Sequence, residues 1–251
     1  MIIAQISDTH IDPEDPNAAS RIGDLERCVM DINGLDPQPD MVIHTGDVTH
    51  NGTAAKYTEA MRILGRLNCP LHVAAGNRDD RALIRSNFVA GRDILADTPY
   101  IQYCVDDYPV RLIALDTLSA TTNMGDFCSI RADSLRRTLA ENTAKPTALF
   151  MHHPPFEVRQ SKYPWQFDSQ DAIAMLGQAL SGQSHVMRAF CGHAHRDASG
   201  AIAEVPTSCV PSVAVDLRLG DFPVAADAAP VYQVHTFDVR RGFTTALRIA
   251  S

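Results

Sequence analysis

The chain has 251 residues, of which 45% are hydrophobic, so it can bury one sizeable core and fits a single α/β domain over residues 1–251. It carries 22 basic and 30 acidic side chains, a formal net charge of −8, and no run of Lys or Arg, which argues against a track for nucleic acid. The first residues lack a basic segment and no apolar stretch approaches ~18 residues, so we expect a cytoplasmic protein without a membrane span.

The amino-terminal part predicts strands and helices in alternation, because short apolar runs follow stretches with helical spacing. The predicted strands are Ile2–Ile6, Met41–Thr45 and Leu71–Ala75, and the predicted helices are Ala18–Leu35, Thr53–Leu67 with Thr53 as the cap, and Asp80–Val89.

The rest of the chain predicts a hairpin, two helices and a series of short strands. These are an antiparallel hairpin over Tyr100–Val105 and Arg111–Leu115, helices over Arg131–Glu141 and Asp171–Leu180, and strands over Thr147–Met151, Val186–Cys191, Ala201–Val205, Ser212–Leu217, Val231–Asp238 and Phe243–Ile249. The pattern indicates two sheets packed together with helices outside. Proline and glycine interrupt the apolar segment 206–230, which could be an arm, a lid, a dimerisation element or a hairpin that closes the second sheet.

Seven potential metal ligands follow the apolar runs, at the ends of predicted strands. They are Asp8, His10, Asp47, Asn77, His152, His193 and His195. We expect the loops that carry them to converge on one edge of a sheet. Carboxylate, amide and imidazole ligands without thiolate suit Zn, Mn, Fe or Co, and seven groups exceed the needs of one tetrahedral ion. The count therefore indicates a pair of divalent metal ions.

Two of the ligand pairs have alternate spacing. Asp8 and His10 follow the first strand, and His193 and His195 follow the strand Val186–Cys191. Because alternate residues of an extended segment point the same way, we expect Asp8 and His10 to bind one ion together. We expect His193 and His195 to reach the same side of an extended chain and to serve neighbouring ions.

The other motifs supply single ligands. The carboxylate of Asp47 has two oxygens and can bridge two ions. Asp79 or Asp80 is expected to cap the helix that follows rather than to bind metal. The adjacent side chains of His152 and His153 are expected to point apart, so we predict that His152 is the ligand and that His153 lines the pocket or supports the ligands.

These motifs, taken in order, resemble those of the calcineurin-like metallophosphoesterases. The series is Asp8-x-His10, Gly46-Asp47, Gly76-Asn77, His152-His153-Pro154 and Gly192-His193-x-His195. The segments ISDTH, TGDVTHNG, AAGNRDD, FMHHPPF and FCGHAH are similar to the branch that holds the class III cyclic nucleotide phosphodiesterases and the GpdQ-like glycerophosphodiesterases. The likeness covers the first four fifths of the chain and is weaker in the tail.

The resemblance implies a fold, a site and a reaction. The fold is a four-layer α/β/β/α sandwich with two mixed sheets and a metal site in the loops at the carboxyl ends of strands. One ion is held by Asp8, His10 and His195, the second is held by Asn77, His152 and His193, and Asp47 bridges them. A hydroxide between the ions would attack phosphorus in line, since two dications lower the pKa of a shared water and stabilise the charge of the transition state.

One position departs from the family pattern, because the residue after the Asn of the GN motif is usually His and is here Arg78. Arginine cannot act as a general acid near neutral pH, but it can bind a phosphate oxygen through two donors. We expect Arg78 to stabilise charge at the substrate, unless it turns outward into a surface ion pair. Protonation of the leaving group then falls to water, to His153 or to His50, which lies just past Asp47 and could contact the substrate.

The predicted function is a metal-dependent phosphoric diester hydrolase that acts on a small diester, such as a cyclic nucleotide like cAMP or a glycerophosphodiester. A broad-range phosphomonoesterase is the alternative, because two ions and Arg78 could accept the extra charge of a monoester. A non-catalytic scaffold of this fold would be expected to lack ligands, and a nuclease to have a basic stripe. The apolar segment 206–230 favours a homodimer or a larger assembly.

Overall fold

A computed structural model of the chain describes residues 1–89 and 91–250. Its strands are β1 (Ile2–Ile6), β2 (Met41–His44), β3 (Leu71–Val73), β4 (Tyr103–Val105), β5 (Arg111–Ala114), β6 (Thr147–Phe150), β7 (Val186–Cys191), β8 (Ala198–Ile202), β9 (Val205–Cys209), β10 (Val231–Asp238) and β11 (Gly242–Ile249). Within the described residues they form a five-stranded sheet in the order β11-β10-β1-β2-β3 and a six-stranded sheet in the order β4-β5-β6-β7-β9-β8.

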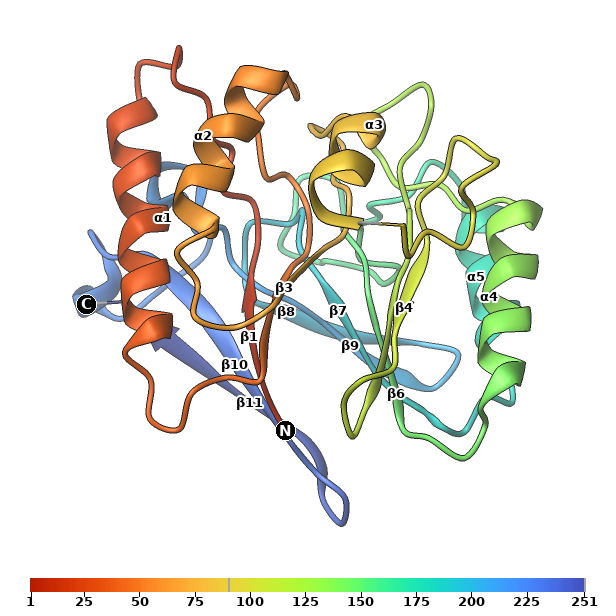
Figure 1. The fold of residues 1–251 in the computed structure, drawn as a ribbon. Coiled ribbons are helices and arrows are strands. Elements are labelled where there is room, and N and C mark those ends of the chain that lie inside the picture. Colours follow the sequence, from red (N-terminus) through yellow and green to blue (C-terminus); the bar gives the residue numbers. More distant parts are fainter. Residues whose placement is uncertain (90, 251) are drawn as a thin grey trace.

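Helices cover the outer faces of both sheets. They are α1 (Ala18–Asn33), α2 (Ala54–Leu64), α3 (Arg81–Ile84), α4 (Ser129–Glu141) and α5 (Gln170–Leu180), with a π-helical turn η1 (Arg85–Val89) and short 3-10 helices η2 (Val215–Leu217) and η3 (Val224–Ala226). Helices α1 and α2 lie on one side of the molecule and α4 and α5 on the other, with the two sheets between them (Figure 1). The predicted four-layer sandwich is therefore confirmed. No helix in the described part of the chain is both long and apolar enough to span a bilayer.

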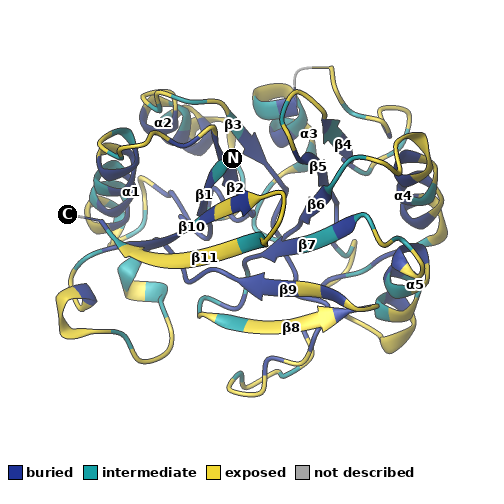
Figure 2. Cartoon of the chain, turned by 90° about the horizontal axis from the view of Figure 1, so that it is seen from below, coloured by how far each residue is buried: buried dark blue, intermediate teal, exposed yellow. Residues whose placement is uncertain are grey.

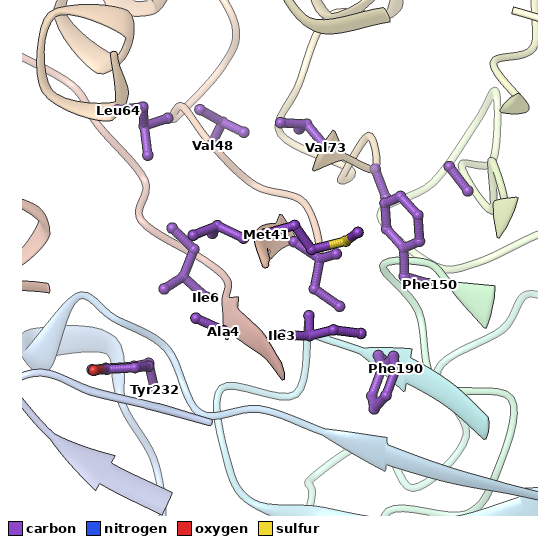
Figure 3. Packing of buried hydrophobic residues seen from close by; sticks show 14 of the residues in the cluster. Ile3, Ala4, Ile6, Met41, Val48, Leu64, Val73, Phe150, Phe190 and Tyr232 are labelled. Carbon is purple, nitrogen blue, oxygen red and sulfur yellow. The ribbon is translucent and has the colours of Figure 1, made fainter. Parts of the chain in front are cut away.

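The core follows from alternation along the strands. Ala148 and Phe150 of β6 belong to the cluster between the two sheets, whereas Leu149 belongs to the cluster beneath α4 and α5. In the inter-sheet cluster, Phe150 and Phe190 of the second sheet lie near Ile3 of the first (Figure 3). Burying each large apolar side chain stabilises the fold by about 1.5–3 kcal/mol. The central strands are buried, while the edge strands β8 and β11 are largely exposed (Figure 2).

The direction of the strands decides where the polar loops meet. Strands β1, β2 and β3 run parallel to one another, and so do β5, β6, β7 and β9. Strands β4, β8, β10 and β11 pair in antiparallel fashion, which makes both sheets mixed. Because parallel strands end at the same edge, the loops after β1, β2, β3, β6 and β7 all reach one edge of the sandwich.

Two of the predicted late strands are wrong. The predicted strand Ala201–Val205 spans the turn between β8 and β9, where Ala203 and Glu204 have positive φ values of 46° and 69°. The predicted strand Ser212–Leu217 contains no strand. Its last three residues form η2, and the backbone N–H of Val215 donates to Asp24 Oδ2 of α1 at 2.9 Å instead of to a neighbouring strand.

The segment 206–230 begins inside a strand and then leaves the sheet. Its first four residues belong to β9, and η2 contacts α1 in the remainder. After Val210 the segment forms short 3-10 helices and turns instead of a strand. The backbone N–H of Val215 donates to the side chain of Asp24 on α1, and that of Val213 donates to the carbonyl of Ser7 in the loop after β1. A role of this segment as an arm, lid or dimerisation element stays a prediction.

Candidate metal centre

The structure brings the potential ligands together where the parallel strands end. Their donor atoms form three overlapping groups, each with all atoms within 4.8 Å of one another: Asp8, His10 and His195; Asp8, Asp47 and His152; and His152, His153 and His193. Asp8 and His152 are fully buried, whereas His193 and His195 are half-buried. Carboxylates withdrawn from water in this way require positive charge close by.

One half of the cluster combines Asp8, His10 and His195. His195 Nε2 lies 3.3 Å from Asp8 Oδ1 and 3.3 Å from His10 Nε2. His10 Nε2 also lies 3.8 Å from Asp8 Oδ1 and 3.5 Å from Asp47 Oδ2. Among the described residues, the buried Asp8 Oδ1 has no hydrogen-bond partner. An oxygen of this kind fits a role as a metal ligand.

The other half combines Asn77, His152 and His193. His152 Nε2 lies 3.0 Å from Asn77 Oδ1 and 3.2 Å from His193 Nδ1. The same nitrogen lies 3.5 Å from Asp47 Oδ1. The two carboxylate oxygens of Asp47 therefore face different halves of the cluster, Oδ2 toward His10 and Oδ1 toward His152. A carboxylate that bridges two ions has this placement.

Hydrogen bonds show which nitrogen His152 and His195 offer to the cluster. His152 Nδ1 lies 2.8 Å from the carbonyl oxygen of Thr45, and His195 Nδ1 lies 3.0 Å from that of Leu217. A carbonyl oxygen only accepts, so each Nδ1 carries a proton and each Nε2 lone pair points into the cluster. Converging lone pairs repel one another unless a cation or a proton lies between them. The donor set therefore fits divalent metal ions.

Charges within the cluster shift the pKa values of its members. Burial alone would raise the pKa of Asp47, but the charge of His152 and its hydrogen bond lower that pKa to about 2. Burial would lower the pKa of His152, but the attraction of Asp47 raises it to about 9. Burial and the charge of His152 lower the pKa of His193 to about 3. The site thus keeps its carboxylate ionised, and a divalent cation can supply the positive charge in place of the His152 proton.

Five of the candidate ligands have left-handed backbone conformations. They are Asp8 (φ 54°), His10 (φ 44°), Asp47 (φ 54°), His193 (φ 65°) and His195 (φ 54°). The expectation that the two alternate pairs lie on extended chain is therefore wrong, because turns rather than the pleat of a strand direct these side chains. Each such residue costs about 1–3 kcal/mol, and the surrounding contacts hold it in place. Backbone hydrogen bonds of 3.0 Å from Asp8 to Gly46 and from His10 to Asp47 join the first two loops.

Two glycines allow the loops to approach closely. A Cβ on Gly76 would lie 2.1 Å from the backbone nitrogen of Asp47 and 2.3 Å from its Oδ1. A Cβ on Gly192 would lie 2.0 Å from Ser7 Oγ and 2.8 Å from Asp8 Oδ2. Ordinary contacts of a Cβ begin at about 3.4 Å. Lack of space therefore requires glycine before Asn77 and at the start of the GHAH segment.

His153 does not point away from His152 as expected. The two ring centroids are 4.8 Å apart, and the ring of His153 lies 4.4 Å from that of His193. Both nitrogens of His153 have other partners, since Nδ1 lies 2.9 Å from Thr117 Oγ1 and Nε2 lies 3.2 Å from the carbonyl oxygen of Asn123. Burial holds its pKa well below the usual value, with the charges of His193 and His152 acting in the same direction. His153 is thus buried against the rings of His152 and His193, with both of its nitrogens close to other partners.

A cavity of about 250 Å³ adjoins the cluster, and both Arg78 and His50 line it. The backbone N–H of Arg78 donates to Asp47 Oδ1 at 2.7 Å, and its guanidinium makes a long hydrogen bond of 3.4 Å to Asn51 Oδ1. Arg78 forms no ion pair with a carboxylate in the described part of the chain, so its charge is free to meet an anion. His50 Nδ1 lies 3.4 Å from His10 Nδ1. Two larger hollows, of about 540 and 580 Å³, are lined by none of the candidate ligands.

The two carboxylates after Arg78 have different roles. Asp80 caps α3 as predicted, because its side chain accepts from the backbone N–H of Leu83 at 2.9 Å. Asp79 instead joins the loops that carry Asp47 and Asn77. Burial, and then the charge of Asp47, raise the pKa of Asp79 to about 6. Its carboxylate accepts from three backbone N–H groups and one hydroxyl, those of Val48, Thr49, Gly76 and Tyr57.

Four residues beside the cluster were not predicted from the sequence: Arg21, Thr117, Asn123 and Leu217. Thr117 follows β5 closely, so its place at a strand end was a signal of the kind that identified the ligands. Asn123 and Leu217 contribute backbone carbonyl oxygens, and residue type does not predict such contacts. Arg21 lies on α1, and it lines the cavity together with Leu217 of η2 while it pairs with Asp216.

Comparisons with known proteins agree with this geometry. The model of the calcineurin-like phosphoesterase family matches residues 1–197. The chain is 31% identical over 252 residues to a probable glycerophosphodiester phosphodiesterase GpdQ of Arcobacter nitrofigilis, an alignment that covers 98% of this chain and 92% of the relative. It is 28% identical over 218 residues to a cAMP/cGMP dual specificity phosphodiesterase of Mycobacterium tuberculosis, covering 82% of this chain and 65% of that protein.

Among solved structures, a dimetal phosphatase from Danio rerio has the same fold. The alignment covers 100% of this chain and 99% of that one, with a TM-score of 0.75 and 12% sequence identity. At this identity the likeness concerns the arrangement of the layers and strands alone.

Proposed function

The chain belongs to the calcineurin-like phosphoesterase family, as its motifs predicted, and from this premise we propose that it hydrolyses small soluble phosphodiesters at a centre of two divalent metal ions. The family and the donor groups make it a metal-dependent phosphoesterase. The relatives act by name on glycerophosphodiesters and on cyclic nucleotides. The proposed substrate is accordingly a cyclic nucleotide such as cAMP or a glycerophosphodiester.

The observation that carries the proposal is the position of Asp47 between two groups of donors. Asp47 Oδ2 lies 3.5 Å from His10 Nε2, and Asp47 Oδ1 lies 3.5 Å from His152 Nε2. One ion would be held by Asp8, His10 and His195, and the other by Asn77, His152 and His193. Asp47 would be shared. Mn, Fe, Zn and Co all suit such nitrogen and oxygen ligands.

Residues of the chain would orient the ligands and contact the substrate. When bound, two divalent ions polarise the phosphoryl group and lower the pKa of a water molecule. The Nδ1 protons of His152 and His195 are held on backbone carbonyls, which keeps each Nε2 facing the cluster. Arg78 lines the cavity and can bind a phosphate oxygen, offsetting the charge that develops during the reaction. His50 also lines the cavity, with its Nδ1 3.4 Å from His10 Nδ1, and we propose that it contacts the ester group.

The cavity of about 250 Å³ beside the donor groups is open to solvent, so a phosphodiester can reach them. A broad-range phosphomonoesterase is the second candidate. The observation in its favour is the guanidinium of Arg78, which has no carboxylate partner among the described residues and could accept the second charge of a monoester.

A substrate panel on metal-free protein refilled with Mn, Zn, Co or Fe tests the proposal. We expect faster turnover of bis-p-nitrophenyl phosphate than of p-nitrophenyl phosphate, and turnover of cAMP or of a glycerophosphodiester. The matched inactive control is Asp47→Asn, which keeps the size of the side chain and removes the shared charge. Faster hydrolysis of the monoester would favour the second candidate, and a fully metallated protein that cleaves no ester would overturn the proposal.

The expected homodimer or larger assembly and the cytoplasmic location stay predictions. Light scattering coupled to size-exclusion chromatography would test the first, and cell fractionation the second.

A further inference from the structure

We propose that the ion pair between Arg21 and Asp216 positions His195, and so sets the affinity of the ion site to which His195 belongs. The inference rests on the proposed metal centre and assigns a role to two residues outside the ligand set. Arg21 lies on α1 and Asp216 lies in η2, 195 positions apart in the sequence.

The contact that η2 makes with the site is the carbonyl of Leu217. His195 Nδ1 lies 3.0 Å from this oxygen, while Nε2 of the same ring lies 3.3 Å from Asp8 Oδ1. Accepting the Nδ1 proton fixes both the tautomer and the rotation of the imidazole, and it leaves the Nε2 lone pair for an ion. The backbone N–H of Leu219 also donates to the carbonyl of His195 at 2.8 Å. The position of η2 therefore decides where Nε2 points.

Helix η2 has little structure of its own to hold that position. It comprises three residues, none of them buried, and the N–H of Leu217 donates to Ala214 at 3.1 Å. A single turn without buried side chains is not fixed by hydrophobic packing. Contacts to its neighbours must hold it in place.

The contact from Arg21 to Asp216 is well formed for this purpose. Arg21 Nε lies 3.1 Å from both carboxylate oxygens of Asp216, and Nη2 lies 2.8 Å from Oδ2. The Arg21 side chain is only 6% exposed, and that of Asp216 is 26% exposed. A planar guanidinium that holds a carboxylate through two nitrogens restricts orientation as well as distance. Asp216 directly precedes Leu217, so a shift of the carboxylate moves the carbonyl that His195 uses.

A second contact places the start of the turn. The backbone N–H of Val215 donates to Asp24 Oδ2 at 2.9 Å, and Asp24 is almost completely buried on α1. On the opposite side, Ser212 Oγ donates to the carbonyl of Asp8 at 2.8 Å. The segment thus spans from α1 to the first ligand loop, and the Arg21–Asp216 ion pair joins η2 to α1 at the residue before Leu217.

The test compares ion binding in Asp216→Ala and Asp216→Asn with the wild-type protein. Metal-free protein is titrated with Mn²⁺ by calorimetry and electron paramagnetic resonance, which resolve two sites without any substrate. The matched control is Glu141→Ala, because Glu141 forms an ion pair of 2.7 Å with Arg111, whose side chain is only 3% exposed. Both Arg21 and Arg111 have a second carboxylate neighbour, which remains in each variant. Nitrogen-15 spectra of His195 report its tautomer in each protein.

We expect both Asp216 variants to bind Mn²⁺ about 10–100-fold more weakly at one site and unchanged at the other. The His195 ring should change from one tautomer to a mixture, and Glu141→Ala should leave both sites unchanged. If Asp216→Ala does not fold, the isosteric Asp216→Asn carries the comparison. Wild-type affinities in Asp216→Asn, or an equal weakening in Glu141→Ala, would overturn the inference.

Failure of this inference and failure of the proposed function can be told apart. A wild-type protein that takes up two ions but cleaves no ester would overturn the proposed function alone, since the titration involves no substrate. Normal ion binding in the Asp216 variants together with ester hydrolysis would overturn the inference alone. A wild-type protein that binds no Mn²⁺ would overturn both.

Discussion

Replacing Gly76 by alanine should disable the metal centre through a clash that nothing nearby can relieve. The new Cβ would lie 2.1 Å from the backbone nitrogen of Asp47 and 2.3 Å from its Oδ1. Both atoms belong to a loop held by backbone bonds, and Gly76 itself is held by the bond from its N–H to Asp79. Restoring an ordinary contact of 3.4 Å requires a shift of about 1.3 Å in one of the two loops.

The size of this shift sets the expected effects. Overpacking of a tight site lowers the free energy of unfolding by about 1–3 kcal/mol. For a chain of this length each kcal/mol changes Tm by about 2–4 °C, so Tm should fall by about 2–12 °C. Misplacement of reacting groups by about 1 Å reduces turnover about 100-fold. Since Asn77 follows Gly76 directly and Asp47 is the other party to the clash, ion binding should weaken at both halves of the cluster.

The assay combines thermal melting, Mn²⁺ titration and turnover of bis-p-nitrophenyl phosphate. Gly23→Ala is the matched control, because Gly23 lies in α1 and a Cβ there would meet nothing within 4 Å. Alanine is favoured over glycine in a helix by about 1 kcal/mol, so this variant should melt about 2–4 °C higher and bind ions normally. A Gly76→Ala protein with wild-type ion affinity and turnover would refute the argument from close approach.

Three further predictions concern charge, metal and pH. Arg78→His should raise the rate on diesters with alkoxide leaving groups relative to p-nitrophenyl esters, because imidazole can donate a proton; a flat or lower ratio would contradict this role. Chelation should abolish turnover and lower Tm, because ions at 100 times their Kd stabilise the native state by about 2.7 kcal/mol. An unchanged Tm after chelation would contradict this prediction. Burial, with Arg188 acting in the same direction, lowers the pKa of His235 to about 3 from 6.5, so only the unfolded chain takes up this proton and stability falls as pH decreases from about 6.5 toward 3. Denaturant unfolding at several pH values gives the slope of the free energy of unfolding against pH. This slope should be shallower in His235→Gln than in the wild-type protein, by up to about 1.4 kcal/mol per pH unit, and equal slopes would contradict the prediction.

Strands with a regular apolar pattern could be predicted well from the sequence. The bounds of Ile2–Ile6, Val186–Cys191 and Val231–Asp238 agree with the structure. A short apolar run bounded by turn residues indicates a central strand that is buried on both faces, and this information is local. The convergence of ligands at one edge was also predictable, because parallel strands end on the same side whatever the details of their loops.

Features set by distant contacts could not be predicted in this way. The turn at Ala203 and Glu204 has positive φ at two residues that carry no turn signal, so the sequence shows an uninterrupted strand pattern. The segment Ser212–Leu217 has apolar spacing typical of a strand, but Asp24 on α1 takes up the backbone N–H of Val215. At Ser212–Leu217 a tertiary hydrogen bond overrides local preference. Ala203 and Glu204 instead form the two-residue turn of the hairpin in which Ile202 pairs with Val205.

The identity of the ligands was easier to predict than their geometry. Residue type and position after a strand point to His193 and His195, but the turn that directs them does not depend on a glycine at either position. The partner of His195 is the carbonyl of Leu217, a group that every residue possesses. The Arg21–Asp216 pair is likewise visible only once the chain is folded.

The left-handed backbone at five candidate ligands bears on how such a protein can evolve. At about 1–3 kcal/mol each, the strain totals about 5–15 kcal/mol, as much as the net folding free energy of a typical domain. Glycine at any of these positions would remove the backbone strain of that residue, but it would also remove a donor atom from the site. A lineage freed from selection for hydrolysis would therefore gain stability in its metal-free form as it replaced these ligands. Only continued demand for turnover keeps these side chains in a backbone that disfavours them.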